Sequence, residues 1–273
     1  MAFYGLVPVL VLILNTGGSL EAEVRSSIIG GQDAPKGSWP WMAHLNITSD
    51  GQEPVALWRS YRQRSVGADC CKLLGCRRPN WRRSFVSVGS HSLTKASARY
   101  MGIDTVMTHR EYQAQSGGYV NDIALVKLKK KLTFSPDVAS VTLPSIDDTF
   151  GSSSECWITG WGNIGTNVPL PDPETLQQLK IPIISQSACK AKYPELTDDM
   201  LCAGSQDGGM DACKGDYGGP LVCRKGSGFV QAGIMSYGSP DGCGLPGRPG
   251  VYTKVSKYLR FINDYIKMDS AEV

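Results

Sequence analysis

The stretch Gly215-Asp-Tyr-Gly-Gly-Pro220 restricts the fold of this 273-residue chain more than any other part of it. Two further stretches precede it, Ile28-Ile-Gly-Gly31 and Asn121-Asp-Ile-Ala-Leu125, and Gly250-Val-Tyr-Thr253 follows it. Each stretch is short, but the four together, in this order and at this spacing, are far more specific than any one of them. They indicate one fold that extends from residue 28 to residue 266.

Short runs rich in Val, Ile, Thr and aromatic residues, separated by Gly, Pro, Ser and Asp, make up most of the chain. This pattern predicts an all-β barrel or sandwich, with strands at 99–109, 122–128, 155–161, 176–184 and 229–237. The C-terminus differs, because Ser256 is a candidate N-cap for apolar residues that recur at helical spacing, namely Tyr258, Leu259, Ile262 and Ile266. We expect a β body closed by one amphipathic helix.

The four stretches resemble the trypsin/chymotrypsin family of serine proteases (peptidase S1), and the chain looks like an inactive tryptase-like homologue. The resemblance covers residues 28–266 with one gap. It implies an all-β protease domain at 28–267, built from two perpendicular six-stranded barrels with a catalytic cleft between them and a C-terminal helix. Catalysis in such a cleft needs a serine nucleophile, a histidine base and a buried carboxylate that orients the imidazole.

The resemblance assigns the carboxylate to Asp122 and places Tyr217 where the family has its serine. A phenol has a pKa of about 10, and its oxygen lies farther from the backbone than a serine oxygen. We therefore expect that Tyr217 does not supply the attacking oxygen, and that its ring fills space needed by the scissile carbonyl. The backbone N–H groups of Gly215 and Tyr217 match the family's oxyanion hole.

The family's histidine motif should fall within 57–83, but this segment is aberrant. The apolar alternation stops there, and eight basic residues stand against one acid, Asp69. The three histidines of the chain lie elsewhere, outside the Thr-Ala-Ala-His-Cys context of the family: His44, His91 and His109. A basic run of this kind is typical of a heparin-binding patch or a solvated loop, and we expect the catalytic base to be absent.

A shifted reading frame is a third interpretation of 57–83. Read one nucleotide later, permitted codons for 57–59 spell Cys-Gly-Gly, and permitted codons for 66–73 spell Trp-Val-Leu-Thr-Ala-Ala, then Asn or Ser, then Cys. The cysteine count agrees, because restoring the frame would turn nine cysteines into eight by adding positions 57 and 73 and removing Cys70, Cys71 and Cys76. The restored codon at the histidine position begins with A from Lys72 and cannot encode histidine. As the sequence stands, we expect a frayed first barrel, because the segment replaces two strands.

The resemblance also implies a substrate pocket and an activation pair. An acid at Asp211 would line the pocket floor and select Lys or Arg, with Ser236, Gly238 and Gly250 around it. Asp216 matches the residue that pairs with the new N-terminal ammonium of Ile28 after zymogen cleavage. The nearest basic residue, Arg25, is separated from Ile28 by two serines, so cleavage after it would misplace the ammonium.

The compartment follows from the N-terminus and the cysteines. An apolar run at 6–14, followed by small residues, predicts a signal peptide at 1–23 and a short propeptide at 24–27, with a retained membrane anchor as the alternative. Cysteines in a secreted chain predict disulfides, and Asn46 begins a glycosylation sequon. By resemblance the disulfide pairs are Cys156–Cys223, Cys189–Cys202 and Cys213–Cys243.

Composition narrows the function classes. A net charge of +3 is too small to predict a nucleic-acid or membrane partner, and we expect no cofactor and no metal cluster. The main hypothesis is a secreted, non-catalytic protease homologue that binds a protein or peptide, such as a serpin-type inhibitor or another protease. The alternatives are a trypsin-like endopeptidase that cleaves after Lys or Arg, its sequence containing errors, and a product without function.

Overall fold

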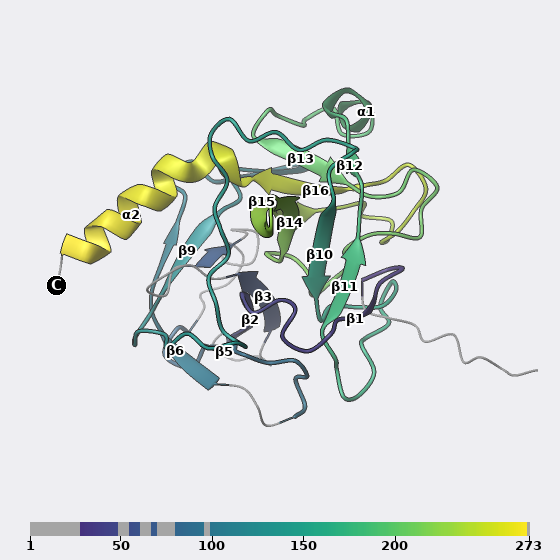
Figure 1. Cartoon of the computed structure of the whole chain (residues 1–273). Helices are drawn as coiled ribbons and strands as arrows, with labels where there is room; N and C mark the ends of the chain where they lie inside the picture. The colour runs from purple at the N-terminus through teal and green to yellow at the C-terminus, as the bar shows by residue number, and fades with distance from the viewer. Residues whose placement is uncertain (1–27, 49–54, 61–66, 70–79, 96–98, 272–273) are drawn as a thin grey trace, which may run out of the picture.

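The structure of the chain is a computed structural model that describes residues 28–48, 55–60, 67–69, 80–95 and 99–271, with the backbone alone at 55–60, 67–69 and 269–271. Figure 1 shows two groups of strands side by side and a long helix at the C-terminus. The signal peptide, the propeptide and the three cysteines at 70, 71 and 76 lie outside the described residues.

The first barrel is a six-stranded sheet with the order β3-β2-β5-β6-β9-β4. All of its strand pairs are antiparallel. Alternating apolar side chains of β2, β5, β6 and β9 form its core, with Leu45 and Val88 fully buried. The strands are β2 (Met42–Ile47), β3 (Val55–Ser60), β4 (Gly67–Asp69), β5 (Phe85–Val88), β6 (Arg99–Thr108) and β9 (Ala124–Leu128).

We expected the 57–83 segment to replace two strands of this barrel, but its backbone contributes to two strands of the sheet. Strand β3 pairs with β2 over six residues, and β4 pairs with β9 over three. Backbone N–H and C=O groups form these ladders, and they do not depend on which side chains the strand carries. The rest of the segment up to residue 79, and the proposed frame shift with it, lies outside what the structure describes.

The second sheet has eight strands in the order β1-β11-β10-β14-β15-β16-β13-β12. Two of them, β11 and β12, are parts of one strand path interrupted at Pro182, which has no N–H to donate to a ladder. Because β11 pairs with β10 and β12 pairs with β13, this path closes the sheet into a six-stranded barrel, to which β1 adds an edge. The strands are β1 (Gln32–Asp33), β10 (Cys156–Gly160), β11 (Gln177–Lys180), β12 (Ile183–Ile184), β13 (Met200–Ala203), β14 (Pro220–Lys225), β15 (Gly228–Tyr237) and β16 (Gly250–Lys254).

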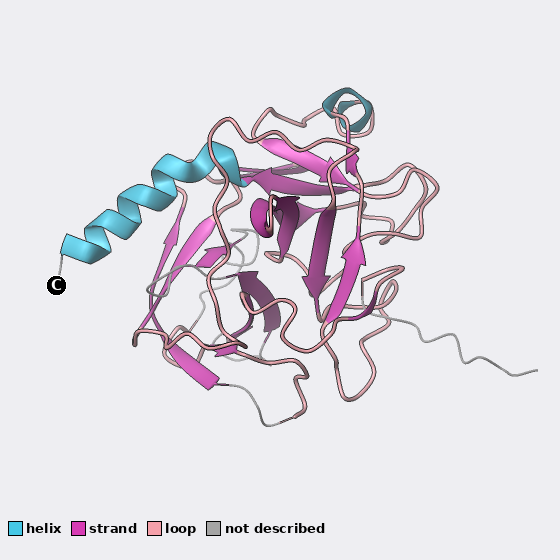
Figure 2. Ribbon diagram, in the orientation of Figure 1, coloured by secondary structure: helices cyan, strands magenta, loops and turns pink. Residues whose placement is uncertain are grey.

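Short elements complete the fold: a hairpin of β7 (Gln113–Gln115) and β8 (Gly118–Val120), a one-turn helix α1 (Gln186–Lys190), a 3-10 turn (Val255–Tyr258) and the helix α2 (Leu259–Ala271). Figure 2 shows how strands and loops outweigh the two helices. Ser256 does not act as the expected N-cap, because it is buried inside the 3-10 turn, whose capping residue is Lys254. No helix among the described residues is long and apolar enough to cross a membrane.

The N-terminal strand and the C-terminal helix each pack on the barrel formed by the other half of the chain. Strand β1 joins the second barrel, whereas α2 and the turn before it pack Tyr258 and Ile262 on the side chains of Ile123 and Leu125 in the first barrel. A mixed core lies between the barrels, where the Trp39 indole N–H donates to the Gln178 side-chain oxygen at 2.7 Å. In the described part of the chain there are three disulfides, all in the second barrel: Cys156–Cys223, Cys189–Cys202 and Cys213–Cys243.

The first barrel is packed well enough for a cavity test. We expect Leu45→Ala to lower the free energy of unfolding by about 2–5 kcal/mol, because Leu45 is fully buried and the cavity would not collapse completely. Ile146→Ala is the matched control, since Ile146 is 77% exposed and its truncation should change stability by less than about 0.5 kcal/mol. Urea unfolding measures both, and equal effects would show that the first barrel is not an ordered core.

Candidate functional site

Asp122 forms hydrogen bonds between the two barrels. It precedes β9 and is 1% exposed, and its Oδ2 accepts a 2.6 Å hydrogen bond from the Ser236 hydroxyl on β15. Its backbone carbonyl accepts another from the Thr253 hydroxyl on β16 at 2.8 Å. The preceding Asn121 has a positive φ of 52° and receives the Tyr258 hydroxyl on its side-chain oxygen. Asp122 is therefore held from the second barrel although it belongs to the first.

The three histidines occupy three separate places. His44 lies within β2, and burial lowers its pKa to about 4, so it is neutral at physiological pH. The backbone carbonyl of His91 accepts the amide N–H of Leu176 at 2.7 Å in the interface between the barrels. His109 packs its ring against Tyr258 and Phe261, and its Nδ1 accepts the Glu111 amide at 3.3 Å.

Tyr217 lies at the centre of a tight turn between Cys213 and Gly219. The amides of Asp216 and Gly219 donate to Cys213 and Asp216 carbonyls at 2.9 Å, and the Gly218 amide donates to the Met235 carbonyl at 2.8 Å. Gly215 and Gly218 have φ angles of 102° and 81°, which glycine adopts without strain. The half-buried Tyr217 side chain packs against the core of the second barrel.

Asp216 is a buried carboxylate held by the same turn. Its Oδ1 accepts the Gly162 amide at 2.9 Å and its Oδ2 accepts the Cys213 amide at 3.0 Å. Burial nevertheless raises its pKa to about 7, against the effect of these two hydrogen bonds. A side chain on Gly162 would come within 2.6 Å of the Asp216 carboxyl carbon, so the glycine is needed for this close approach.

Ile28 lies fully buried in the core beside this turn. Its amide donates to the Asn163 carbonyl at 3.2 Å, next to the Gly162 amide that binds Asp216. Ile29 forms an antiparallel bridge with Asp211, with hydrogen bonds of 2.9 and 3.2 Å. The beginning of the domain thus pairs with Asp211 and lies next to the segment whose Gly162 amide binds Asp216.

Asp211 has a partly satisfied carboxylate inside the second barrel. Its Oδ2 accepts the Gly244 amide at 3.0 Å, but its buried Oδ1 has no hydrogen-bond partner among the described residues. Burial raises its pKa to about 7. A Cβ on Gly250 would lie 3.0 Å from this oxygen and 3.2 Å from the Met235 methyl group.

The structure therefore brings together some of the site residues predicted from the sequence, but not all of them. Asp211 and Gly250 are neighbours, and Gly238 lies near Met235. Ser236 donates its hydroxyl to Asp122, so this hydroxyl serves the carboxylate. Asn46 lies inside β2, between β3 and β5, with its side-chain oxygen buried, whereas a glycosylation site is expected in a surface loop. Glycosylation of Asn46 stays a prediction.

Sequence reasoning missed several residues that shape the site. Gly160 and Gly162 make room for the Asp216 carboxylate, and the Gly160-Trp-Gly162 triplet was the available signal. Tyr237 was also missed; it is buried next to Ser236 and contacts the rings of Tyr119 and Tyr193. No local pattern marks such a cluster, because its members come from separate elements.

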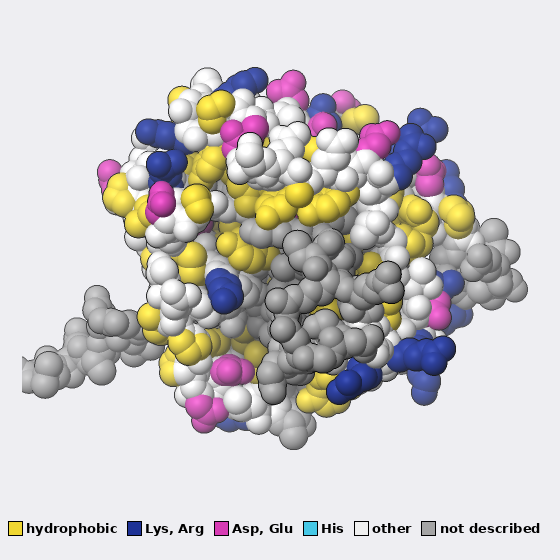
Figure 3. All heavy atoms as spheres, turned by 180° about the vertical axis from the view of Figure 1, so that it is seen from behind, with side chains coloured by type: hydrophobic (Ala, Val, Ile, Leu, Met, Phe, Trp, Pro, Cys, Tyr) yellow, Lys and Arg dark blue, Asp and Glu magenta, His cyan; other side chains and the backbone are white. Residues whose placement is uncertain are grey.

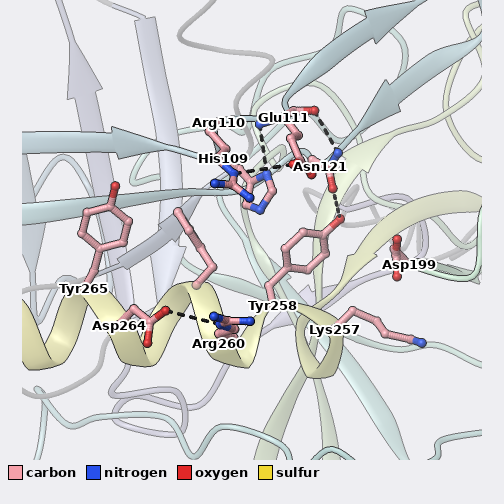
Figure 4. A pocket seen from close by; sticks show the side chains of 11 residues that line it. His109, Arg110, Glu111, Asn121, Asp199, Lys257, Tyr258, Arg260, Asp264 and Tyr265 are labelled. Carbon is pink, nitrogen blue, oxygen red and sulfur yellow. Dashed lines mark hydrogen bonds and ion pairs between the residues drawn. The ribbon is translucent and has the colours of Figure 1, made fainter.

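Two cavities are lined by described residues other than Asp122, Tyr217 and Asp211. One pocket of about 490 Å³ lies between the 109–111 turn and the start of α2, where Arg110 pairs with Glu111 and Arg260 pairs with Asp264 (Figure 4). Another, of about 420 Å³, lies between the 144–152 loop and β12. Among the residues that the structure describes, no group of three or more His, Cys, Asp and Glu is placed to hold a metal ion.

Comparisons with known proteins agree on one family. The family model described as Trypsin matches residues 67–262. The chain is 35% identical over 265 residues to tryptase of Mus musculus, covering 91% of this chain and 92% of the mouse protein. It is 36% identical over 251 residues to testisin of Homo sapiens, covering 88% and 78%. Coagulation factor XI of Bos taurus is 34% identical over 244 residues, covering 88% of this chain but 38% of factor XI.

The close approach of Gly162 to Asp216 can be tested by adding one methyl group. We expect Gly162→Ala to lower the free energy of unfolding by about 1–3 kcal/mol, because the new Cβ would overlap the carboxylate. Gly228→Ala is the control, since a Cβ there meets no atom within 4 Å. Thermal unfolding of the two variants should separate them clearly. Equal melting temperatures would contradict the described cradle.

Burial of Asp216 predicts a pH dependence of stability. Its folded pKa of about 7 exceeds the ordinary value of 3.8, so the folded chain binds more protons than the unfolded chain between these values. The stabilising contribution is therefore complete below about pH 4 and is lost as the pH rises through about 7. We expect the melting temperature to fall over this range, and Asp216→Asn to flatten the fall. Asp264→Asn, at an exposed position, should leave the profile unchanged.

Proposed function

Because the chain belongs to the trypsin family of serine proteases, we propose that it is a non-catalytic member, which binds a basic side chain of a protein or peptide without cutting it. The observation that carries the proposal is Tyr217 in the tight turn where the family has its serine nucleophile. The proposal separates two properties that the family combines: the recognition of a Lys or Arg side chain and the attack on the bond next to it.

Three features support the loss of attack. Tyr217 packs its ring against the second-barrel core, and a phenol held this way does not place an oxygen at the position of a serine oxygen. His109, the histidine nearest in sequence to Asp122, packs its ring between aromatic side chains. The neutral, buried His44 lies within a strand. Without a base to accept the proton, even a hydroxyl nucleophile would be inactive.

Asp211 supports retained recognition of a cation. A buried carboxylate oxygen without a hydrogen-bond partner is costly, and a guest ammonium or guanidinium group would satisfy it. Glycines at 238 and 250 leave space for a side chain to reach it, since a Cβ at Gly250 would lie 3.0 Å from the free oxygen. We infer that the preferred guest is Lys or Arg in an exposed loop of another protein, such as a protease or a serpin-type inhibitor.

Activation and secretion belong to the same proposal. Asp216 would be relieved of its unfavourable burial by an ammonium group at Ile28, which contacts the adjacent Asn163 carbonyl. Cleavage after Arg25 would leave two serines before Ile28 and would not create that ammonium. The three disulfides are compatible with an oxidising compartment, and we propose that the chain is secreted.

A trypsin-like endopeptidase is the second candidate function. The hydrogen bond from Ser236 to Asp122 favours it, because the orienting carboxylate is held in place although it has no catalytic use in the first proposal. This candidate requires that the natural protein differ from the present sequence both at position 217 and in the 57–83 segment.

The two candidates differ in a binding and labelling experiment. We expect the secreted chain, cleaved before Ile28 at an engineered site, to bind benzamidine while an arginine phosphonate fails to label it. Asp211→Asn should abolish benzamidine binding, and Asp207→Asn, at an exposed position, should leave it unchanged. Covalent labelling, or turnover of an arginine amide, would establish the endopeptidase. Absence of benzamidine binding would refute the recognition proposal.

The pH profile of binding provides a separate prediction. The Asp211 carboxyl must be charged to bind a cation, and burial raises its pKa to about 7. We expect the dissociation constant for benzamidine to be constant above about pH 8 and to rise about tenfold per pH unit below about 7. Isothermal titration between pH 5 and 9 measures this. A profile without this rise would show that binding does not involve Asp211.

A further inference from the structure

The two barrels differ strongly in charge. Residues 28–143, which contain the first barrel, have 16 Lys and Arg against 8 Asp and Glu, whereas residues 144–273 have 11 against 15. A net charge of only +3 for the whole chain hides this separation. Such an asymmetry between halves points to a binding surface on the basic half.

Part of the basic excess gathers on one surface of β5, β6 and the turn after β9. We call this surface the basic face and define it by Arg82, Arg83, Arg99, Lys129 and Lys131, all of which are exposed. Phe85, which follows the two arginines, pairs with Gly102, and the Lys129 side chain crosses the same glycine, its Cδ lying 3.1 Å from where a Cβ would be. The Lys129 amide donates to the Gly102 carbonyl at 2.9 Å.

Arg99 fixes the geometry of this face. Its guanidinium donates to the Thr133 carbonyl at 3.2 Å and to the Ser135 hydroxyl at 3.1 Å. Both acceptors are neutral, so these bonds hold the side chain without cancelling its charge. They also fix the turn on either side of Phe134, which is 42% exposed.

Acidic residues are few in the described segments that form this face, although the exposed Asp104 lies within β6. Residues 80–95, 99–103 and 124–136 contain no Asp and no Glu, and Asp104 and Asp137 are the nearest acids along the chain. Figure 3 views the molecule from behind and shows Lys and Arg side chains gathered at the lower right. This is the side on which β5 and β6 lie, at the lower left of Figure 1. The positive potential of such a segregated surface extends about one Debye length, roughly 8 Å at physiological salt.

We propose that the basic face binds an acidic peptide segment of a protein partner, in which carboxylates alternate with aromatic or large aliphatic side chains. The charges require an anionic ligand, and their spread over several strands and turns requires an extended one. Neither of the two pockets described above is lined by a residue of the basic face.

Exposed aromatic rings favour a peptide over a sulfated polysaccharide. Tyr100 is 66% exposed beside Arg99 and meets Phe85 edge-on at 5.2 Å, and Phe134 is exposed between the two groups that Arg99 holds. Large exposed apolar side chains within a charged surface supply binding energy when a partner covers them. A peptide offers apolar side chains to these rings, whereas a sulfated sugar chain offers mainly charge.

The experiment compares three probes on the full-length secreted chain. The first is a short synthetic peptide in which glutamates alternate with phenylalanine and leucine. The second has serine at every apolar position, and the third is a heparin oligosaccharide of the same charge. We expect the first peptide to bind about thirtyfold more tightly than the second, since two aromatic contacts of about 1 kcal/mol each correspond to that ratio, and to bind more tightly than the oligosaccharide.

Variants assign the two parts of the interaction. Lys129→Ser with Lys131→Ser should weaken both peptides by about fivefold to tenfold, whereas Lys180→Ser with Lys190→Ser, an equal loss of charge on the other barrel, should not. Tyr100→Ser with Phe134→Ser should remove the advantage of the apolar peptide. All three double variants change exposed residues, and melting temperatures check that each one folds.

Three results would overturn the proposal: equal binding of the two peptides, tighter binding of the oligosaccharide than of the apolar peptide, or no effect of the Lys129 and Lys131 changes. The outcome of this experiment is independent of cation binding at Asp211, because Asp211 is not part of the basic face and none of the three probes is a cation. Benzamidine binding, measured on the same variants, should remain unchanged.

Discussion

The hydrogen bond between Ser236 and the buried Asp122 carboxylate is the contact on which the arrangement of the two barrels depends. A carboxyl group that is 1% exposed is tolerated only when hydrogen bonds replace its hydration. Ser236 belongs to the other barrel, so the two barrels must meet in one relative position for this hydrogen bond to form. Thr253, which binds the Asp122 carbonyl from β16, adds a second restraint in the same place.

The second barrel contains two further buried carboxylates that are satisfied to different extents. Asp216 receives two amide hydrogen bonds, and glycines at 160 and 162 leave just enough room for it. Asp211 receives hydrogen bonds on one side only, and its other oxygen faces the space left open by Gly250. For both groups burial outweighs these bonds and raises the pKa to about 7. Buried acids of this kind are expected where a cation is to be received, which is why recognition and catalysis can be separated in the proposed function.

The positions of most strands were predictable because a strand is a local pattern. The runs at 99–109, 155–161 and 229–237 became β6, β10 and β15, with ends differing by a residue or two. The strand formation at 55–60 and 67–69 was not predictable, because the side chains there lack alternation and the pairing comes from neighbours β2 and β9. The prediction of the helix start was wrong for a similar reason. Ser256 lies in a buried 3-10 turn, together with the buried side chains of Val255 and Tyr258.

The sequence by itself determined the family framework, the tyrosine at position 217 and the cysteine pairs that resemblance implied, because all of these are matters of residue identity and spacing. Only the tertiary structure decided what each side chain contacts. Ser236 and Asp122 are 114 residues apart, and no local pattern states that they bond. Likewise, the segments that carry Arg83, Arg99 and Lys129 come together only because β5, β6 and β9 are neighbours in the sheet. Hydrogen bonding and charge act through space, so segments distant in sequence acquire a shared chemistry only once the chain has folded.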